Sequence, residues 1–192
     1  IAGTVGPPLP GIEARITDSE GKKLDAGDTG MLEVRGPNVF KGYWRQAEKT
    51  AAEFRGDGFF ITGDLARIDE RGYVSIVGRA NDMIISGGYN VYPKEVEMVI
   101  DTVGGVAESA VVGLTHPDFG EAVVAVVRRR EESGGPSEEE IIAAVKQDLA
   151  NYKVPKRVFF TEELPRNSMG KVQKNVLREN FADTFSAPPG NT

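Results

Sequence analysis

The chain has 192 residues, 40% hydrophobic and 27% charged, as is usual for a globular protein with a packed core. It has no cysteine and one histidine, which excludes disulfides, thiolate zinc sites and cysteine nucleophiles and makes a serine–histidine–aspartate hydrolase hard to build. We expect no metal site within it. The net charge of −6 argues against general nucleic-acid binding, and no apolar run approaches the ~20 residues of a membrane span.

The sequence pattern of residues 1–78 predicts a β-rich subdomain. Alternating hydrophobic residues predict short strands in 12–18 and 31–36, and a helical pattern runs from Gln46 to Phe54. Three further strands are predicted in the segments GFFITGD (58–64), LARID (65–69) and YVSIVG (73–78). Short strands at regular spacing favour a small barrel-like or sandwich arrangement.

Residues 79–183 read as a second, compact α+β domain, with the boundary between Gly78 and Asp82. Gly87-Gly88 predicts a hairpin turn, and Pro93 opens a helix. Apolar strands follow in 106–114, 121–130 and 157–162, with a helix from the cap Ser137 to about 150. A polar loop at 164–171 and an amphipathic helix from 172 complete the domain. We expect 184–192 to be a disordered tail. The fold class is therefore α+β.

Lys171 follows Gly170 in a loop of mobile composition. The pair is not a Walker loop, because position 165 is proline and position 172 is valine. Two interpretations stay open: a solvated loop lysine, or a cation that meets a phosphate. The segment from Lys153 to Arg178 has seven lysines and arginines against two glutamates, which predicts a cationic patch suited to a small polyanion.

Two other segments have both an ordinary and a functional interpretation. Asp64, after Thr-Gly, either forms an Asx-type turn or accepts two hydrogen bonds from the vicinal hydroxyls of a ribose. Gly87-Gly88 is either a simple turn or a place where a narrow ligand approaches the backbone closely. The lone His116 is expected in a turn before a strand, without a catalytic role.

The order and spacing of these motifs resemble the AMP-forming acyl-CoA synthetases of the adenylate-forming superfamily. The resemblance covers residues 1–183 and rests on the following segments: VGPPLPG, VFKGYW, DGFFITGDL, DERGY, GRANDMIISGGYNVYPKEVE and PRNSMGKVQKN. Three segments are most similar in sequence to malonyl-CoA synthetases, namely SGGYNVYPKEVE, HPDFGE and LPRNSMGKVQKN.

The resemblance implies a role for particular residues. Lys171 corresponds to the catalytic lysine that bridges the acid and the α-phosphate during adenylation. Asp64 and Arg79 correspond to the ribose contacts of the nucleotide. Asn81 stands at the hinge, where many relatives have aspartate or lysine.

The resemblance also implies contacts with coenzyme A. Gly87 and Gly88 correspond to the turn that lines the tunnel for its pantetheine arm. Tyr152 and Lys153 resemble part of a tetrapeptide that contacts the nucleotide of coenzyme A. Lys171 and the glycine turn are expected on different faces of a mobile C-terminal domain, one face for each half-reaction.

By this resemblance, residues 1–78 are the last β-rich subdomain of a large N-terminal adenylation domain. The chain begins at Ile1 in a Gly/Pro-rich stretch and looks like part of a longer protein whose missing domain holds the acid pocket, the adenine pocket and the Mg²⁺ ligands. The expected substrates are ATP, coenzyme A and a carboxylic acid, malonate or methylmalonate first. The alternatives are a fatty-acyl or aryl-CoA ligase, an enzyme that loads a carrier protein, and a binding module without chemistry. We expect a cytoplasmic protein, and no activity from this chain alone.

Overall fold

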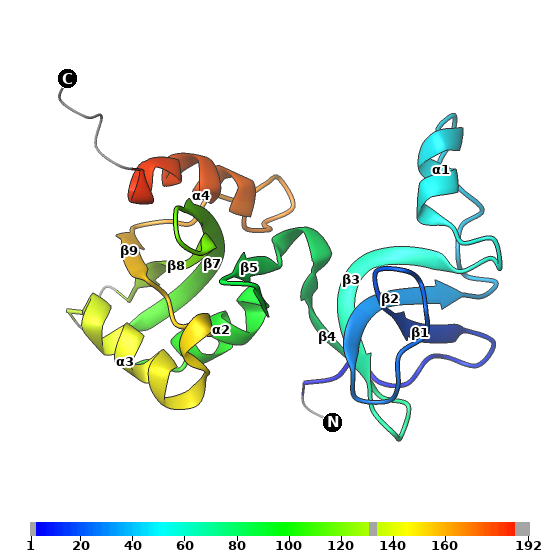
Figure 1. Cartoon of the computed structure of the whole chain (residues 1–192), viewed down its shortest axis with the longest axis horizontal. Coiled ribbons are helices and arrows are strands. Elements are labelled where there is room, and N and C mark those ends of the chain that lie inside the picture. Colours follow the sequence, from blue (N-terminus) through cyan, green and yellow to red (C-terminus); the bar gives the residue numbers. More distant parts are fainter. Residues whose placement is uncertain (1–2, 131–133, 187–192) are drawn as a thin grey trace. The chain divides into compact units, whose positions relative to one another are not determined.

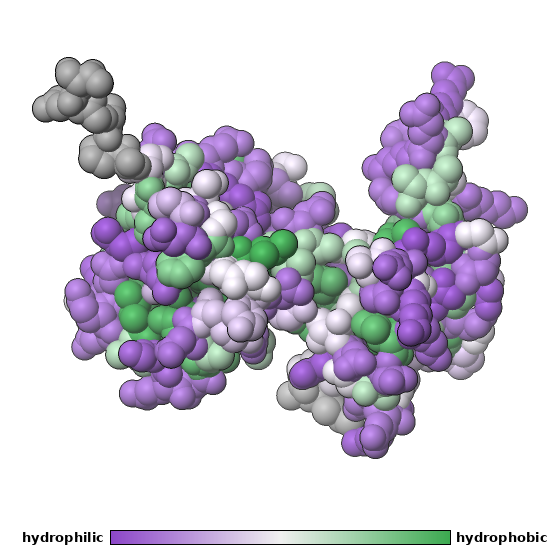
Figure 2. Space-filling view, in the orientation of Figure 1, coloured by the Kyte–Doolittle hydropathy of each residue, from purple (hydrophilic) through white to green (hydrophobic). Residues whose placement is uncertain are grey.

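The computed structural model describes residues 3–130 and 134–186, and it divides into two compact units, 1–81 and 82–192 (Figure 1). The predicted α+β class is confirmed. Both units show a mainly hydrophilic surface on the visible face, where hydrophobic residues form separate patches (Figure 2). Within the described ranges, no helix is long and apolar enough to cross a membrane.

The first unit is built on a four-stranded antiparallel sheet in which each strand pairs with the next along the chain. A small core on this sheet contains Ile16, Leu32, Ala66 and Val74. The strands are β1 (Glu13–Thr17), β2 (Thr29–Arg35), β3 (Phe60–Ile68) and β4 (Val74–Arg79), with helix α1 (Ala47–Glu53) between β2 and β3.

The third strand differs from the prediction. Two strands were expected in 58–64 and 65–69, but β3 runs without interruption through Gly63, whose φ is +75°. Its pairing with β4 shifts register between Leu65 and Ala66. An irregularity of this kind bends a strand without ending it. Asp64 therefore lies within a paired strand and not at a strand end.

A buried carboxylate holds the first unit together at one side of the sheet. The side chain of Glu33 is 0% exposed, and it accepts hydrogen bonds from Arg15 Nε at 2.8 Å, Arg55 Nε at 2.8 Å and Thr17 Oγ1 at 3.1 Å. Arg15 also donates to Asp57 at 2.6 Å, and this hydrogen bond holds the pKa of Asp57 below its usual value. Two guanidinium groups thus balance the charge of Glu33, as a buried carboxylate requires.

The second unit is built on a five-stranded mixed sheet. Strand β8 pairs antiparallel with β7 on one side, and on the other with β9 in parallel and with β5, which carries β6. These strands are β5 (Ile84–Ser86), β6 (Tyr89–Val91), β7 (Val106–His116), β8 (Gly120–Arg129) and β9 (Arg157–Thr161). The helices are α2 (Pro93–Ile100), α3 (Glu138–Asp148) and α4 (Lys174–Asn180), with 3-10 helices η1 (Ala80–Asp82), η2 (Asn151–Lys153) and η3 (Ala182–Phe185).

Alternate residues of the central strands face two different cores. Val111, Val123 and Ala125 pack with α2 and α3, whereas Val112 and Val124 pack with α4. Since successive side chains of a strand point to opposite faces, the two cores lie on the two faces of the sheet. Figure 1 shows the same arrangement, with α4 on one side of β7 and β8 and with α2 and α3 on the other.

Local sequence explains where two helices begin. Pro93 is the first residue of α2, where its missing N–H costs nothing. Ser137 caps α3 in a full capping box with Glu140, because each side chain accepts a hydrogen bond from the other's backbone N–H. Both starts confirm the predicted positions.

The C-terminal end differs from the prediction of a long helix from 172. Helix α4 ends at Asn180, and η3 follows. Phe181 stacks on Phe159 at 4.3 Å between ring centroids, and Phe185 lies 4.9 Å from His116. The apolar spacing that predicted a helix is thus met by a short helix and a 3-10 turn. Residues 184 and 185 belong to this packed end; 187–192 of the predicted tail lie outside the described residues.

Candidate active site

The loop that carries Lys171 connects β9 to α4 and is a closed, hydrogen-bonded turn. The backbone N–H of Asn167 donates to the carbonyl of Lys171 at 2.9 Å, and Gly170 N–H donates to the carbonyl of Asn167 at 2.9 Å. The Asn167 side-chain oxygen accepts from the N–H groups of Met169 and Lys171, both at 3.0 Å. The loop is therefore ordered, although its composition is typical of mobile loops. The Asn167 side chain orders it because its oxygen accepts backbone N–H groups of the turn.

An arginine next to the turn fixes it further. Arg166 donates to the carbonyl of Gly170 at 2.7 Å and forms an ion pair with Glu108 of β7. Gly170 has a φ of +78°, a left-handed conformation that favours glycine. No role was predicted for Asn167 or Arg166 from the sequence. An asparagine three residues before a glycine was the available signal.

Lys171 differs from most of its cationic neighbours because its ammonium group has no ion-pair partner, and it differs from Lys156, whose ammonium lies 4.9 Å from the centre of the Phe119 ring, because it contacts no aromatic ring among the described residues. Among the described residues, nothing forms an ion pair or a side-chain hydrogen bond with it, and the residue is exposed. Five of the seven cations between Lys153 and Arg178 are ion-paired, and these five are Lys153, Arg157, Arg166, Lys174 and Arg178. The predicted cationic patch is therefore largely neutralised by acids from other segments. A rigid backbone here presents one free ammonium group.

Asp64 and Arg79 lie together in the first unit. They are directly opposite on β3 and β4, and Arg79 Nε is 2.9 Å from Asp64 Oδ1. Arg79 also donates to the carbonyl of Thr62 at 3.3 Å, and the Thr62 hydroxyl accepts the backbone N–H of Asp64 at 3.0 Å. The arrangement presents one carboxylate and one guanidinium side by side, a donor and acceptor pair suited to hydroxyl groups.

The two glycines form the turn of the β5–β6 hairpin, as predicted. Their φ values are +58° for Gly87 and +83° for Gly88, the positive angles of a type I′ turn. Gly87 N–H donates to the carbonyl of Phe119 at 2.9 Å. A Cβ at Gly88 would meet nothing within 4 Å among the described residues, so the space above the turn is open.

Tyr152 and Lys153 lie in η2, and Tyr152 lies next to the same hairpin. The ring of Tyr152 stacks on Tyr89, the residue after Gly88, at 4.7 Å between centroids and an angle of 21°. Lys153 Nζ lies 2.7 Å from both carboxylate oxygens of Glu95. Lys153 is thus already paired, and it can reach a phosphate only by sharing or leaving Glu95.

The candidate residues of the second unit fall into two groups. Tyr152 packs against the core on the α2–α3 face, whereas Val172, next to Lys171, packs against the core on the α4 face. Asn81 lies in η1 and is exposed, and within the described residues it has no side-chain partner. The lysine loop and the Tyr89–Tyr152 stack are thus anchored on opposite faces of one sheet.

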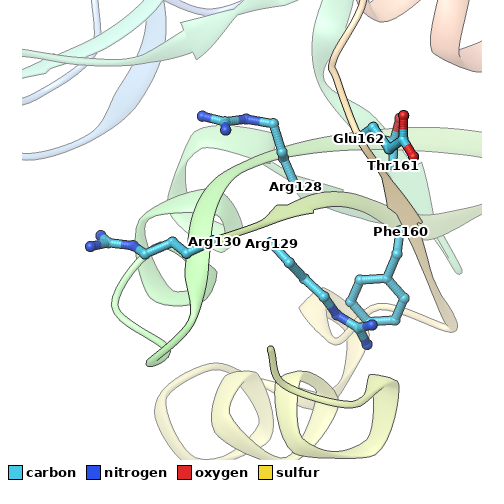
Figure 3. Close-up of a pocket in the computed structure, with 6 residues that line it drawn as sticks. All are labelled: Arg128, Arg129, Arg130, Phe160, Thr161 and Glu162. Carbon is cyan, nitrogen blue, oxygen red and sulfur yellow. The ribbon is translucent and has the colours of Figure 1, made fainter. Parts of the chain in front are cut away.

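A cavity of about 600 Å³ in the second unit is lined by none of these residues. Its lining consists of Arg128, Arg129, Arg130, Phe160, Thr161 and Glu162 (Figure 3). The three arginines point in different directions, and Arg129 is held over the Phe160 ring at 3.5 Å and by the carbonyl of Pro136. This cavity does not gather positive charge toward one point, so we assign it no ligand.

Comparison with known families identifies both parts of the chain. Residues 1–44 match the model of the AMP-binding enzyme family, and residues 95–171 match the model of the AMP-binding enzyme C-terminal domain. The chain belongs to the AMP-binding enzyme family. The family membership predicted from the ordered motifs is confirmed.

Individual relatives of the chain are named as CoA ligases. Over 93% of its length it is 45% identical to a dioxo-octahydroindenyl-propanoyl:CoA ligase from Rhodococcus jostii, and over 94% it is 43% identical to malonate–CoA ligase from Arabidopsis thaliana. Among solved structures, ATP-bound MatB from Rhodopseudomonas palustris is 58% identical, with a TM-score of 0.91 over 96% of this chain and 37% of that one. The chain spans 33% and 31% of the two ligases, about a third of their length.

Proposed function

We propose that the protein carrying this chain is an AMP-forming acid–CoA ligase. In the first half-reaction a carboxylate oxygen attacks the α-phosphorus of ATP, which gives an acyl-adenylate and releases pyrophosphate. In the second the thiol of coenzyme A attacks the acyl carbon, which gives a thioester and releases AMP. The observation that carries the proposal is the free ammonium group of Lys171 on an ordered turn, at the last residue matched by the C-terminal family model.

Lys171 has the chemistry that the first half-reaction needs. The attacking carboxylate and the α-phosphate are both anions and repel each other as they approach. A cation between them offsets this repulsion and stabilises the negative charge of the transition state. The fixed backbone at Asn167 and Gly170 delivers the lysine, while its flexible side chain covers the last few ångströms.

The nucleotide and coenzyme A would contact different residues. Asp64 would accept hydrogen bonds from the ribose hydroxyls of ATP, with Arg79 as a second contact. The Gly87-Gly88 turn would line the path of the pantetheine arm, with Tyr152 and Lys153 near the nucleotide of coenzyme A. The exposed side chains of Ile85, Tyr89 and Phe119 at this hairpin offer apolar surface to such an arm.

The two faces of the second unit support a division of labour. We assign the first unit to the end of a large adenylation domain and the second to a mobile C-terminal domain that turns at Asn81. One orientation would present Lys171 for adenylation, and the other the glycine turn for thioester formation. Within the described residues, no group of three or more histidine, aspartate or glutamate side chains could hold a metal ion.

Malonate or methylmalonate is the acid that we propose first, since the Arabidopsis thaliana relative is named a malonate–CoA ligase. Other relatives are named for indoleacetate and long-chain fatty acids, which keeps aryl and fatty acids as alternatives.

ATP–pyrophosphate exchange by the full-length protein should be measured with malonate, methylmalonate, acetate, octanoate, palmitate and coumarate. We expect exchange with one class of acid, and thioester formation when coenzyme A is added. If no acid of the panel supports exchange, the proposal that the full-length protein adenylates one of these acids is wrong. The 192-residue chain alone should show no exchange.

The second half-reaction gives a separate prediction. Gly88→Leu should slow transfer from a supplied acyl-adenylate to coenzyme A, because the new side chain points into the open space above the turn. We expect at least a tenfold loss in the CoA step, with ATP–pyrophosphate exchange unchanged within about twofold. Gly72→Leu is the matched control, because Gly72, in the turn between β3 and β4, has the same φ of +83° as Gly88 and likewise nothing within 4 Å of an added Cβ among the described residues. Normal thioester formation by Gly88→Leu would contradict the tunnel role.

A further inference from the structure

We propose that Arg178 and Asp82 form a link that fixes Lys171 relative to the hinge, so that Arg178 is a positioning residue for adenylation. The inference rests on the proposed function and extends it to a pair of residues outside the reacting groups. Arg178 Nη2 lies 2.8 Å from Asp82 Oδ1, and the two residues are 96 positions apart in the sequence.

Asp82 is the first charged residue after the hinge. It ends the 3-10 helix η1 and directly follows Asn81, which is uncharged and has no side-chain partner in the described part of the chain. The side chain of Asp82 is 29% exposed and its carboxylate is held by Arg178. The hinge end of the second unit is therefore tied to α4 through this one ion pair.

Helix α4 is in turn tied to the lysine loop. Lys174 and Arg178 are four residues apart, so both lie on one face of the helix. Lys174 Nζ is 2.7 Å from Glu97 Oε1, and Leu177 is buried in the core beneath the helix. The loop itself joins α4 through the backbone hydrogen bond from Gln173 N–H to the carbonyl of Pro165, at 2.8 Å. Lys171 thus stands three residues before a helix that is fixed to the sheet and to the hinge.

The consequence is that a rotation at Asn81 moves Asp82, α4 and the Lys171 loop as one body. Without the link, the end of α4 and the loop before it gain freedom while the rest of the sheet stays in place. A misplacement of about 1 Å costs a reaction of this kind roughly 100-fold, because the reacting groups must be aligned. The Gly87-Gly88 turn belongs to the β5–β6 hairpin, whose Ile84 and Val91 pack in the other core, so the CoA step should keep its rate.

A purely structural role predicts a different result. The pair is partly exposed, 31% for Arg178 and 29% for Asp82, and ion pairs of this kind contribute little to stability. A variant at Arg178 should therefore stay folded. General damage to the fold would slow both half-reactions together, whereas loss of positioning slows only adenylation.

The test compares the two half-reactions in the full-length protein. Arg178→Gln should lower the rate of ATP–pyrophosphate exchange 10- to 100-fold, in line with the cost of misplacement, and leave transfer from a supplied acyl-adenylate to coenzyme A within about twofold. The charge swap Asp82→Arg with Arg178→Asp should restore most of the exchange. Arg157→Gln is the matched control, since Arg157 pairs with Glu138 at 3.2 Å on a different helix and should affect neither step. Unchanged exchange in Arg178→Gln, or equal loss of both steps, would overturn the inference.

A second measurement separates this inference from the proposed function. Amide hydrogen exchange of Met169 and Lys171 in the 192-residue chain reports the order of the loop without any substrate. We expect faster exchange at both amides in Arg178→Gln than in Arg157→Gln. If the unsubstituted full-length protein adenylates no acid, the proposed function fails while this measurement still decides on the link. Identical amide exchange in the two variants would refute the proposed positioning role of the Arg178–Asp82 pair, even if the full-length protein is an active ligase.

Discussion

Replacing Lys171 with alanine should lower the rate of acyl-adenylate formation in the full-length protein by about 100- to 1,000-fold, the usual cost of removing one preorganised group that stabilises developing charge. The backbone of the loop should not change, because Lys171 contributes only its backbone N–H and carbonyl to the hydrogen bonds with Asn167, and Gly170 contributes only its backbone N–H. Transfer from a supplied acyl-adenylate to coenzyme A should continue at nearly the normal rate. The measurement is ATP–pyrophosphate exchange beside single-turnover thioester formation.

Two further substitutions make this result specific. Lys146→Ala removes an exposed lysine of α3, on the other face of the sheet, and should leave both half-reactions unchanged. Lys171→Arg keeps the charge but replaces a compact ammonium with a planar fork, so it should remain well below the unsubstituted rate. If Lys171→Ala slows both half-reactions equally, the assignment of this lysine to adenylation alone is wrong.

The sequence predicted the elements that depend on local patterns. The Gly87-Gly88 hairpin, the start of α2 at Pro93 and the cap of α3 at Ser137 all follow from conformational preferences of one or two residues. The ordered motifs also identified the family. What the candidate residues do was inferred from those motifs, and the structure adds their surroundings.

The surroundings could not be predicted, because they depend on partners far away in the sequence. The cationic stretch from Lys153 to Arg178 gave no sign that acids of β7, α2, α3 and η1 would pair with most of it. Local spacing also could not show that β3 continues through Gly63, since a bend and an end look alike in a sequence. Among the described residues of this stretch, the structure thus separates Lys171 from five ion-paired cations and from Lys156, which lies over the Phe119 ring.

The pairs around α4 suggest why a lysine loop so near the chain end is ordered. Helix α4 has only seven residues, too few to be stable without tertiary contacts. Leu177 in the core and the ion pairs of Lys174 and Arg178 supply these contacts. Among them, the pair between Lys174 and Glu97 is the most buried, with side-chain exposures of 18% and 8%. It should therefore contribute most to the stability of this end of the second unit.

Glu97→Ala should lower the free energy of unfolding of the second unit by about 3–5 kcal/mol, the usual cost of removing one partner of a buried ion pair. Glu97 Oε1 accepts the N–H of Val111 on the edge strand β7 at 2.9 Å as well as the ammonium of Lys174, so alanine leaves two donors without an acceptor. The amide exchange of β7 and β8 measures this loss in the 192-residue chain. Glu97→Gln keeps an acceptor for Val111 and should lose less. Glu95→Ala, on the same helix, removes a more exposed acid and should cost about 1 kcal/mol or less. Equal losses from Glu97→Ala and Glu95→Ala would show that burial of the pair does not decide its contribution.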